Sequence, residues 1–115
     1  MGVTIYGIKN CDTMQKALAW LKSHGVAHAF HDYKKAGVDE AALDHWIATV
    51  GWEALLNRAG TTFRKLDEAD RADIDSAKAR RLMIANPSLI KRPVIEGATE
   101  LLVGFKTDRY ETAGL

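Results

Sequence analysis

The chain has 115 residues, of which 47% are hydrophobic, so it is long enough to bury a core of its own and has about the usual size of one domain. Sixteen Lys and Arg residues against fifteen Asp and Glu residues give a net charge of +1, too balanced for a protein dedicated to nucleic acid or membrane surfaces. No apolar run approaches the roughly 20 residues that cross a bilayer, and the N-terminus lacks the pattern of a secretory signal. We therefore expect a single cytoplasmic domain, residues 1–115, that is monomeric and binds neither nucleic acid nor membranes.

The first predicted elements are a strand and a helix. Residues 3–8 (VTIYGI) are β-branched, aromatic and almost all apolar, as in a short strand buried on both faces. From residue 12 the apolar spacing becomes helical, and Gly25 ends the segment. The apolar residues at this spacing are Met14, Ala17, Leu18 and Leu21.

Residues 26–33 (VAHAFHDY) predict a second strand. Asp39 is then placed to cap a helix that ends at Gly51 and whose apolar residues fall at i, i+3, i+4 and i+7. Residues 52–75 are polar and broken by glycine, which favours short helical pieces over a strand.

The remaining segments predict a helix, a hairpin and a last helix. Ser76 can cap a helix that Asn86 and Pro87 end. Two apolar runs, 93–95 and 101–105, are separated by a turn with a glycine and form a β-hairpin, and a short helix starts at Thr107 or Asp108.

This order of elements predicts the fold class. Two strands joined by a helix favour a parallel right-handed unit, and the hairpin adds antiparallel strands. We expect an α/β, thioredoxin-like mixed sheet with helices on both sides and an all-helical insertion at about residues 38–88.

Cys11 stands where the predicted strand gives way to the helix, and it is the only cysteine. It has no internal disulfide partner. A thiolate is the reactive form, and the free N–H groups at a helix N-terminus stabilise an anion. Lys9 and Lys16 act in the same direction and Asp12 opposes them. The alternative is that Cys11 is a small buried hydrophobic residue.

The same N–H groups can also hold an anionic substrate, so the nucleophile and the binding site would coincide. The residues around the thiol that we predict to contribute are Lys9, Asn10, Asp12 and Thr13. A metal site is not predicted: His28 and His31 point to opposite faces of a strand, and the ligand count is too low.

Three motifs carry a resemblance to a known family: TIYGIKNCDTMQKALAWL, LLNRAGTTFRKL and NPSLIKRPVI. In this order and spacing they resemble the arsenate reductase (ArsC) and Spx family, most closely its YffB branch. The resemblance implies a thioredoxin-like fold with a helical insertion, a nucleophilic Cys11, and an arginine before a proline at Arg92 and Pro93. In related folds that proline follows a cis peptide bond, which implies that the Arg92–Pro93 segment lies against the thiol loop.

Two arginines are candidates to bind an anion. Arg92 matches the family motif, and a guanidinium offers bidentate geometry to a carboxylate. Arg58 is offset by one position from the family's arginine, because Asn57 directly follows the two leucines. Its alternative role is that of a solvated loop charge.

Two residues that are typical of the family are missing here, and each absence argues against one of the family's functions. Arsenate reductases have a third arginine near ELLVGF, where the nearest cation here is Lys106, which puts arsenate as a substrate in doubt. Spx-type regulators use a pair of cysteines as a switch, but Met14 occupies the second position and forms no disulfide.

The leading hypothesis is a glutathione-dependent thiol/disulfide reductase in which Cys11 forms a mixed disulfide that an external thiol resolves. Glutathione is the expected co-substrate, with glutaredoxin or a protein disulfide as further partners and no bound cofactor. Two alternatives stay open. One is an Spx-like regulator that binds a protein such as RNA polymerase, and the other is an arsenate reductase with altered anion contacts.

Overall fold

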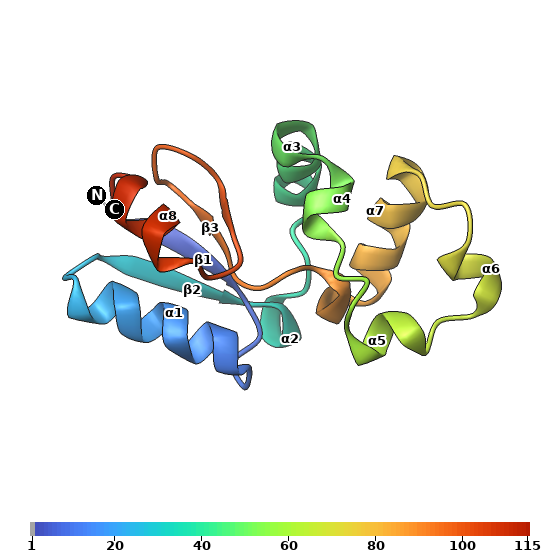
Figure 1. Cartoon of the computed structure of the whole chain (residues 1–115), viewed down its shortest axis with the longest axis horizontal. Helices are drawn as coiled ribbons and strands as arrows, with labels where there is room; N and C mark the ends of the chain where they lie inside the picture. Colours follow the sequence, from blue (N-terminus) through green and yellow to red (C-terminus); the bar gives the residue numbers. More distant parts are fainter. Residues whose placement is uncertain (1) are drawn as a thin grey trace. The chain divides into compact units, whose positions relative to one another are not determined.

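The computed structural model describes residues 2–115, which divide into two compact units. We call the first the sheet unit: it runs to Ala36 and resumes from Arg92 to Leu115. The second, Gly37–Lys91, is the helical unit. The strands that are labelled in Figure 1 lie in the first unit, and the second unit is a run of helices.

The sheet unit contains a mixed four-stranded sheet in the order β2-β1-β3-β4. Its strands are β1 (Val3–Gly7), β2 (His28–Asp32), β3 (Val94–Glu96) and β4 (Leu102–Val103). β1 pairs in parallel with β2 and antiparallel with β3, and β3 and β4 form an antiparallel pair. The predicted parallel unit and hairpin are therefore both present, and the α/β fold class is confirmed.

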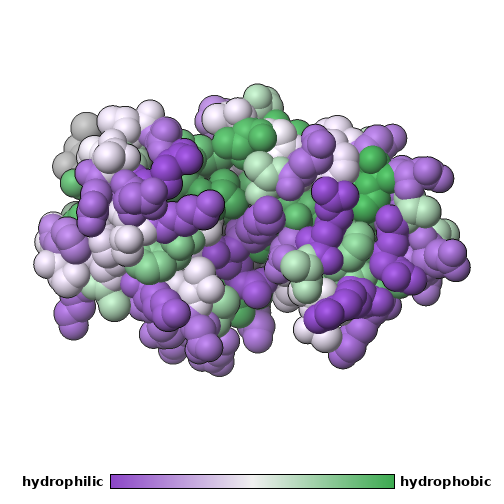
Figure 2. Space-filling model, in the orientation of Figure 1, coloured by the Kyte–Doolittle hydropathy of each residue, from purple (hydrophilic) through white to green (hydrophobic). Residues whose placement is uncertain are grey.

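Helix α1 (Asp12–Ser23) covers one face of this sheet. Its apolar stripe packs with residues of β1, β3 and β4 in one core, because the helical spacing of these residues places them on one side. Hydrophilic residues occupy the exposed side of the helix, seen as the purple atoms at the lower left of Figure 2. The buried stripe comprises Met14, Ala17 and Leu21.

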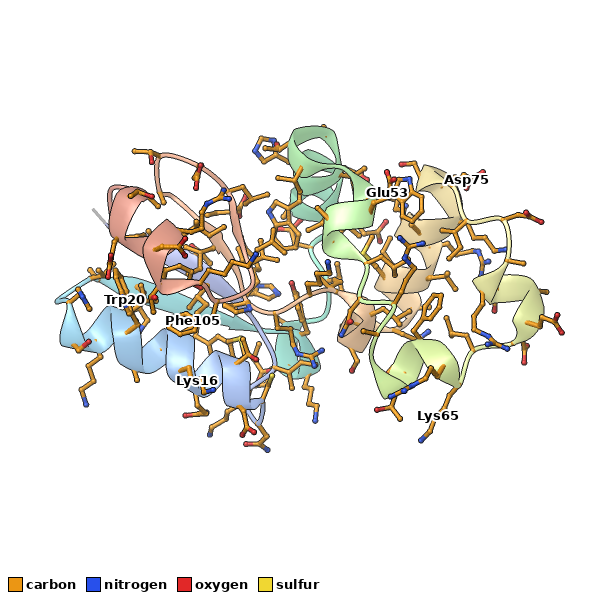
Figure 3. The ribbon with its side chains drawn as sticks, in the orientation of Figure 1. Lys16, Trp20, Glu53, Lys65, Asp75 and Phe105 are labelled. Atoms are coloured by element: carbon orange, nitrogen blue, oxygen red, sulfur yellow. The ribbon has the colours of Figure 1, made fainter. Side chains whose placement is uncertain are left out.

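The C-terminal helix α8 (Thr107–Thr112) packs against the same core through an aromatic cluster. The ring of Tyr110 meets those of Trp20 and Phe105 edge to face, at centroid distances of 5.3 and 5.0 Å. The Tyr110 hydroxyl donates to the Gly104 carbonyl at 2.9 Å. Trp20 from α1 and Phe105 from the segment before α8 are labelled in Figure 3. The short helix predicted at Thr107 is thus confirmed.

The helical unit consists of short helices, as predicted for residues 52–75. A backbone bridge between Leu56 and Ile90 joins the middle of this unit to its last residues. On its surface, Arg80 binds Asp44 at 2.6 Å and Glu40 at 3.1 Å, and the hydrogen bond from Arg80 lowers the pKa of Asp44. The helices are α3 (Glu40–Val50), α4 (Trp52–Leu55), α5 (Thr61–Arg64), α6 (Glu68–Arg71), α7 (Ser76–Ala85) and the 3-10 turn η1 (Pro87–Leu89).

The predicted start of the second strand was wrong by two residues. Val26 ends α1 instead: its N–H donates to the carbonyl of Leu21 at 2.9 Å, and the N–H of Gly25 donates to that of Lys22 at 3.2 Å. This is the Schellman arrangement, which requires the left-handed φ of +65° that Gly25 supplies. The backbone of Val26 is therefore committed to the helix end.

Two further boundaries differ from the prediction. Tyr33 does not end β2 but begins the short helix α2 (Tyr33–Ala36), because Asp32 accepts the N–H of Lys34 at 2.9 Å. Ser76 is the first residue of α7, and the cap is Asp75, whose carboxylate accepts the N–H of Lys78 at 2.8 Å. The predicted cap at Asp39 is confirmed, with the N–H of Ala42 at 3.1 Å.

Candidate functional site

The sheet topology brings three chain segments to one edge. β1 and β2 are parallel and end in register, with Gly7 opposite Asp32. β3 runs the other way and begins with Val94 opposite Tyr6. The residues after β1, the residues after β2 and the residues before β3 therefore share this edge, which is where ligands bind in many sheets of this kind.

Cys11 lies at this edge as the N-cap residue of α1, with extended backbone angles (φ −127°, ψ 131°). Its carbonyl accepts the first bond of the helix from the N–H of Gln15 at 3.0 Å. The Gln15 side chain reaches back to the carbonyl of Lys9 at 2.8 Å and so anchors the loop before the cysteine. The thiol is free and half-buried, and the prediction of a thiol at the strand-to-helix junction is confirmed.

Burial is the largest single influence on the Cys11 thiol and raises its pKa, but several smaller opposing effects together leave the pKa below its ordinary value. The N–H of Met14, the side chain of Arg92 and the N–H of Thr13 act on the sulfur as hydrogen-bond donors, and the positive charge of Arg92 adds to them. Both amides belong to the first turn of α1, whose dipole also favours an anion at this position. The thiolate is therefore favoured, as its reactivity requires.

Three charged side chains close to Cys11 in the sequence are predicted to influence its thiol. Lys9, Lys16 and Asp12 are exposed, and none of them is among the groups that shift the pKa within the described part of the chain. Solvent screens such charges, whereas a backbone amide at the helix terminus is fixed beside the sulfur. Lys16 points away from α1 in Figure 3. The predicted effect of these three charges on the thiolate therefore stays a prediction.

Arg92 comes immediately before β3 and is brought to Cys11, as the family motif implied. Its side chain is half-buried. The Arg92–Pro93 peptide bond is cis, as expected, and the buried Pro93 accepts the N–H of Gly104 through its carbonyl at 2.8 Å. The structure therefore joins two predicted site residues, Cys11 and Arg92, that are 81 positions apart in the sequence.

The other predicted site residues have simpler surroundings. Asn10 is exposed beside the cysteine, and Thr13 is half-buried in the first turn of α1. Arg58 belongs to the helical unit, where it is exposed and its guanidinium carbon lies 5.7 Å from the centre of the Trp52 ring. Binding of an anion by Asn10, Thr13 and Arg58 stays a prediction.

Met14 occupies the position where related proteins have a second cysteine, and its side chain packs in the hydrophobic core. Its side chain is fully buried, and a Cβ atom on Gly7 would lie 2.3 Å from its sulfur. The glycine thus leaves the space that the methionine fills. A disulfide with Cys11 is excluded, so any disulfide at this site joins Cys11 to another molecule.

Tyr33 lies at the site but is not predicted by the sequence pattern. The pattern predicts the end of a strand at Tyr33, whereas this residue begins α2 at the same edge as Cys11 and Arg92 and is only 3% exposed. The preceding Asp32, a residue typical of caps and turns, was the signal that could have shown it to open a new element.

Two further properties concern the described residues 2–115 as a whole. No helix in this range is long and apolar enough to cross a membrane. No group of three or more His, Cys, Asp or Glu side chains in the same range is placed to hold a metal ion.

Comparison with known proteins places this geometry in a family. The model of the ArsC family matches residues 6–113, nearly the whole chain. The chain belongs to the ArsC family. The match includes both Cys11 and Arg92, and it confirms the resemblance drawn from the three sequence motifs.

Solved structures and a curated relative of the ArsC chain agree with this assignment. A YffB protein is 58% identical with a TM-score of 0.94, and the match covers 98% of this chain and 99% of that one. An arsenate reductase (ArsC) related protein from Brucella melitensis is 61% identical with a TM-score of 0.78, covering 96% and 92% of the two chains. The global transcriptional regulator Spx of Streptococcus pneumoniae is 27% identical over 92% of this chain and 80% of its own length. The thioredoxin-like fold and the similarity to YffB and Spx proteins are therefore established.

Proposed function

We propose that this ArsC-family protein is a glutathione-dependent thiol/disulfide reductase with Cys11 as its nucleophile. One observation carries the proposal: the amides of Thr13 and Met14 and the side chain of Arg92 together lower the pKa of the only thiol in the chain. A lowered pKa at a half-exposed cysteine is the property that distinguishes reactive thiols from structural ones.

The absence of a second cysteine determines the order of steps. The Cys11 thiolate attacks one sulfur of a substrate disulfide RS–SR′, forms Cys11–S–S–R and releases R′S⁻, which takes a proton from water. A glutathione thiolate then attacks the Cys11 sulfur, which forms Cys11–S–S–G and releases RS⁻. A second glutathione thiolate attacks the glutathione sulfur of this intermediate, yielding oxidised glutathione and the Cys11 thiolate. Two glutathione molecules are oxidised for each substrate disulfide reduced.

Arg92 has two roles in this scheme. In the free protein it stabilises the Cys11 thiolate, and in the complex its guanidinium binds a carboxylate of glutathione. The remaining contacts come from residues next to the thiol in sequence or at the same sheet edge: Lys9, Asn10, Asp12, Thr13 and Pro93. Glutaredoxin is the alternative source of the resolving thiol.

Mass spectrometry after treatment with oxidised glutathione tests this proposal. We expect an adduct of one glutathione on the native chain and none on Cys11→Ser. Reduction of bis(2-hydroxyethyl) disulfide by glutathione should be accelerated by the native protein only. Native protein that forms no adduct and accelerates no reduction would refute the proposal.

A second candidate function is transcriptional regulation through binding of a protein partner. It is favoured by the similarity to Spx, named a global transcriptional regulator, over 92% of this chain. The missing second cysteine argues against a redox switch of the paired kind. Capture of RNA polymerase from lysate by both the native protein and Cys11→Ser, without turnover of the model disulfide, would favour this function. Arsenate-dependent oxidation of glutathione would instead indicate arsenate reduction.

A further inference from the structure

Tyr33 holds a buried polar group that the fold does not use. The side chain is 3% exposed, and its hydroxyl has no hydrogen-bond partner among the residues that the structure describes. The great majority of buried polar groups are paired, because burying one without a partner costs free energy comparable to a lost hydrogen bond. A phenylalanine would fill the same space without that cost. The hydroxyl therefore does not stabilise the fold, and its presence points to a role in binding another molecule.

The neighbours of Tyr33 hold its ring in place. The ring of His31 packs against it edge to face at 5.8 Å, and the cap by Asp32 fixes the first turn of α2. The other tyrosine in this region, Tyr6, already has an acceptor, since its hydroxyl donates to the carboxylate of Glu96 at 2.5 Å. Of the two phenols, only Tyr33 has a donor to spare.

Arg92, which lowers the pKa of the Cys11 thiol, also affects the pKa of Tyr33. Burial raises the pKa of the Tyr33 hydroxyl far above its ordinary value, the nearby Tyr6 and Glu96 add to this effect, and the positive charge of Arg92 opposes it. At neutral pH the phenol is thus protonated and can donate a hydrogen bond. The charge of Arg92 thus acts on both the Cys11 thiol and the Tyr33 hydroxyl.

From this arrangement we infer that the Tyr33 hydroxyl is a second donor, beside Arg92, for a carboxylate or other oxyanion of the molecule that reacts at Cys11. The inference rests on the proposed function and extends it from the nucleophile to the groups that bind the substrate. The three residues come from the ends of β1 and β2 and the start of β3, which the strand register brings to one edge of the sheet. Because the hydroxyl is covered in the free protein, binding of an anion to it requires the side chains around it to move.

A neutral donor next to a guanidinium suits an oxyanion for a physical reason. The guanidinium supplies the charge, and the hydroxyl supplies a directed bond that a halide or a neutral ligand uses less well. A hydrogen bond to a charged group is stronger than one between neutral groups, so its loss should be measurable. Tyr33 would then decide which ligands bind rather than how reactive the thiol is.

The test measures protection of Cys11 from iodoacetamide by two unreactive anions, S-methylglutathione and inorganic phosphate. In Tyr33→Phe we expect the dissociation constant of the protecting anion to rise about tenfold or more, since a hydrogen bond to a charged group is lost. The alkylation rate without an anion should stay within about twofold of the native rate, because the hydroxyl is not one of the groups that lower the pKa of Cys11. Tyr33→Met, which also lacks the hydroxyl, should show the same loss of protection and serves as a second variant.

Tyr110→Phe is the matched control. Its hydroxyl is also in the sheet unit but is satisfied by the Gly104 carbonyl, so the variant should lower the melting temperature and leave anion protection unchanged. Tyr33→Phe should not lower the melting temperature, because no hydrogen bond is lost.

The outcomes separate this inference from the function it rests on. Equal protection of the native protein and Tyr33→Phe by both anions overturns the inference, even where the glutathione adduct forms on Cys11. Absence of protection in the native protein also overturns it. Protection by phosphate alone that Tyr33→Phe weakens supports the anion site and contradicts glutathione as its ligand.

Discussion

A Cβ atom on Gly7 would lie 2.3 Å from the sulfur of Met14 and 2.9 Å from its terminal carbon. The last residue of β1 and the first turn of α1 are thus packed with no space for a methyl group. Met14 is fully buried in this contact. The position three residues after Cys11 is therefore a packing position in this protein, and the methionine that fills it forms no disulfide with the thiol.

The first prediction concerns this contact. Gly7→Ala should lower the free energy of unfolding by about 1–3 kcal/mol, because the added methyl group overpacks a filled core. Met14→Ala should lower it by roughly 2–5 kcal/mol through the cavity it leaves. In the double variant the methyl group at position 7 partly fills that cavity. Urea denaturation should show a combined loss smaller than the sum, and strictly additive losses would contradict the contact.

The second prediction separates two adjacent residues at the start of α7. Asp75→Ala should lower the free energy of unfolding by about 0.5–2 kcal/mol, because its carboxylate accepts the N–H of Lys78 at 2.8 Å. Ser76→Ala should have little effect, since Ser76 is exposed inside the first turn and is not the cap. Thermal unfolding of the two variants measures this difference. A larger loss in Ser76→Ala would place the cap at the residue that the sequence alone suggested.

The cap at α7 illustrates what local sequence determines. Asp75 and Ser76 are both good capping residues, so the chain predicts a helix start there without deciding between them. The junction at Cys11 was predictable because the apolar period changes from that of a strand to that of a helix within a few residues. The start of β2 was not predictable in this way, because the N–H of Val26 donates to the carbonyl of Leu21 and so belongs to the end of α1.

Some residues of the candidate site could likewise be predicted from the sequence, and others could not. Arg92 could be linked to Cys11 only through the family motif, because the strand pairing that joins them is a tertiary property. Tyr33 was missed for the same reason: nothing near it in sequence shows that its hydroxyl is buried without a partner. Lys9 and Lys16 are close to Cys11 in sequence, yet both are exposed, and the groups that lower the pKa of the thiol are the amides of the first turn of α1 and the side chain of Arg92.

The third prediction links the thiol to stability. Because the folded protein holds the pKa of Cys11 below its value in the unfolded chain, about 8.5, the thiolate adds stability that is fully present above the unfolded pKa. This contribution is lost as the pH falls through the folded pKa. The free energy of unfolding of the native protein minus that of Cys11→Ser should therefore rise with pH across this window. A difference that stays constant or falls with pH would show that the fold does not favour the thiolate.

The most direct test of the account is the rate of Cys11 alkylation by iodoacetamide as a function of pH. We predict a midpoint clearly below that of a free cysteine, near 8.5, and a midpoint shifted upward in Arg92→Gln. Arg109→Gln is the control, because Arg109 pairs with Glu100 elsewhere in the sheet unit, and it should leave the midpoint unchanged. A native midpoint equal to that of free cysteine and unmoved by Arg92→Gln would contradict the claim that the amides of α1 and Arg92 keep this thiol ionised.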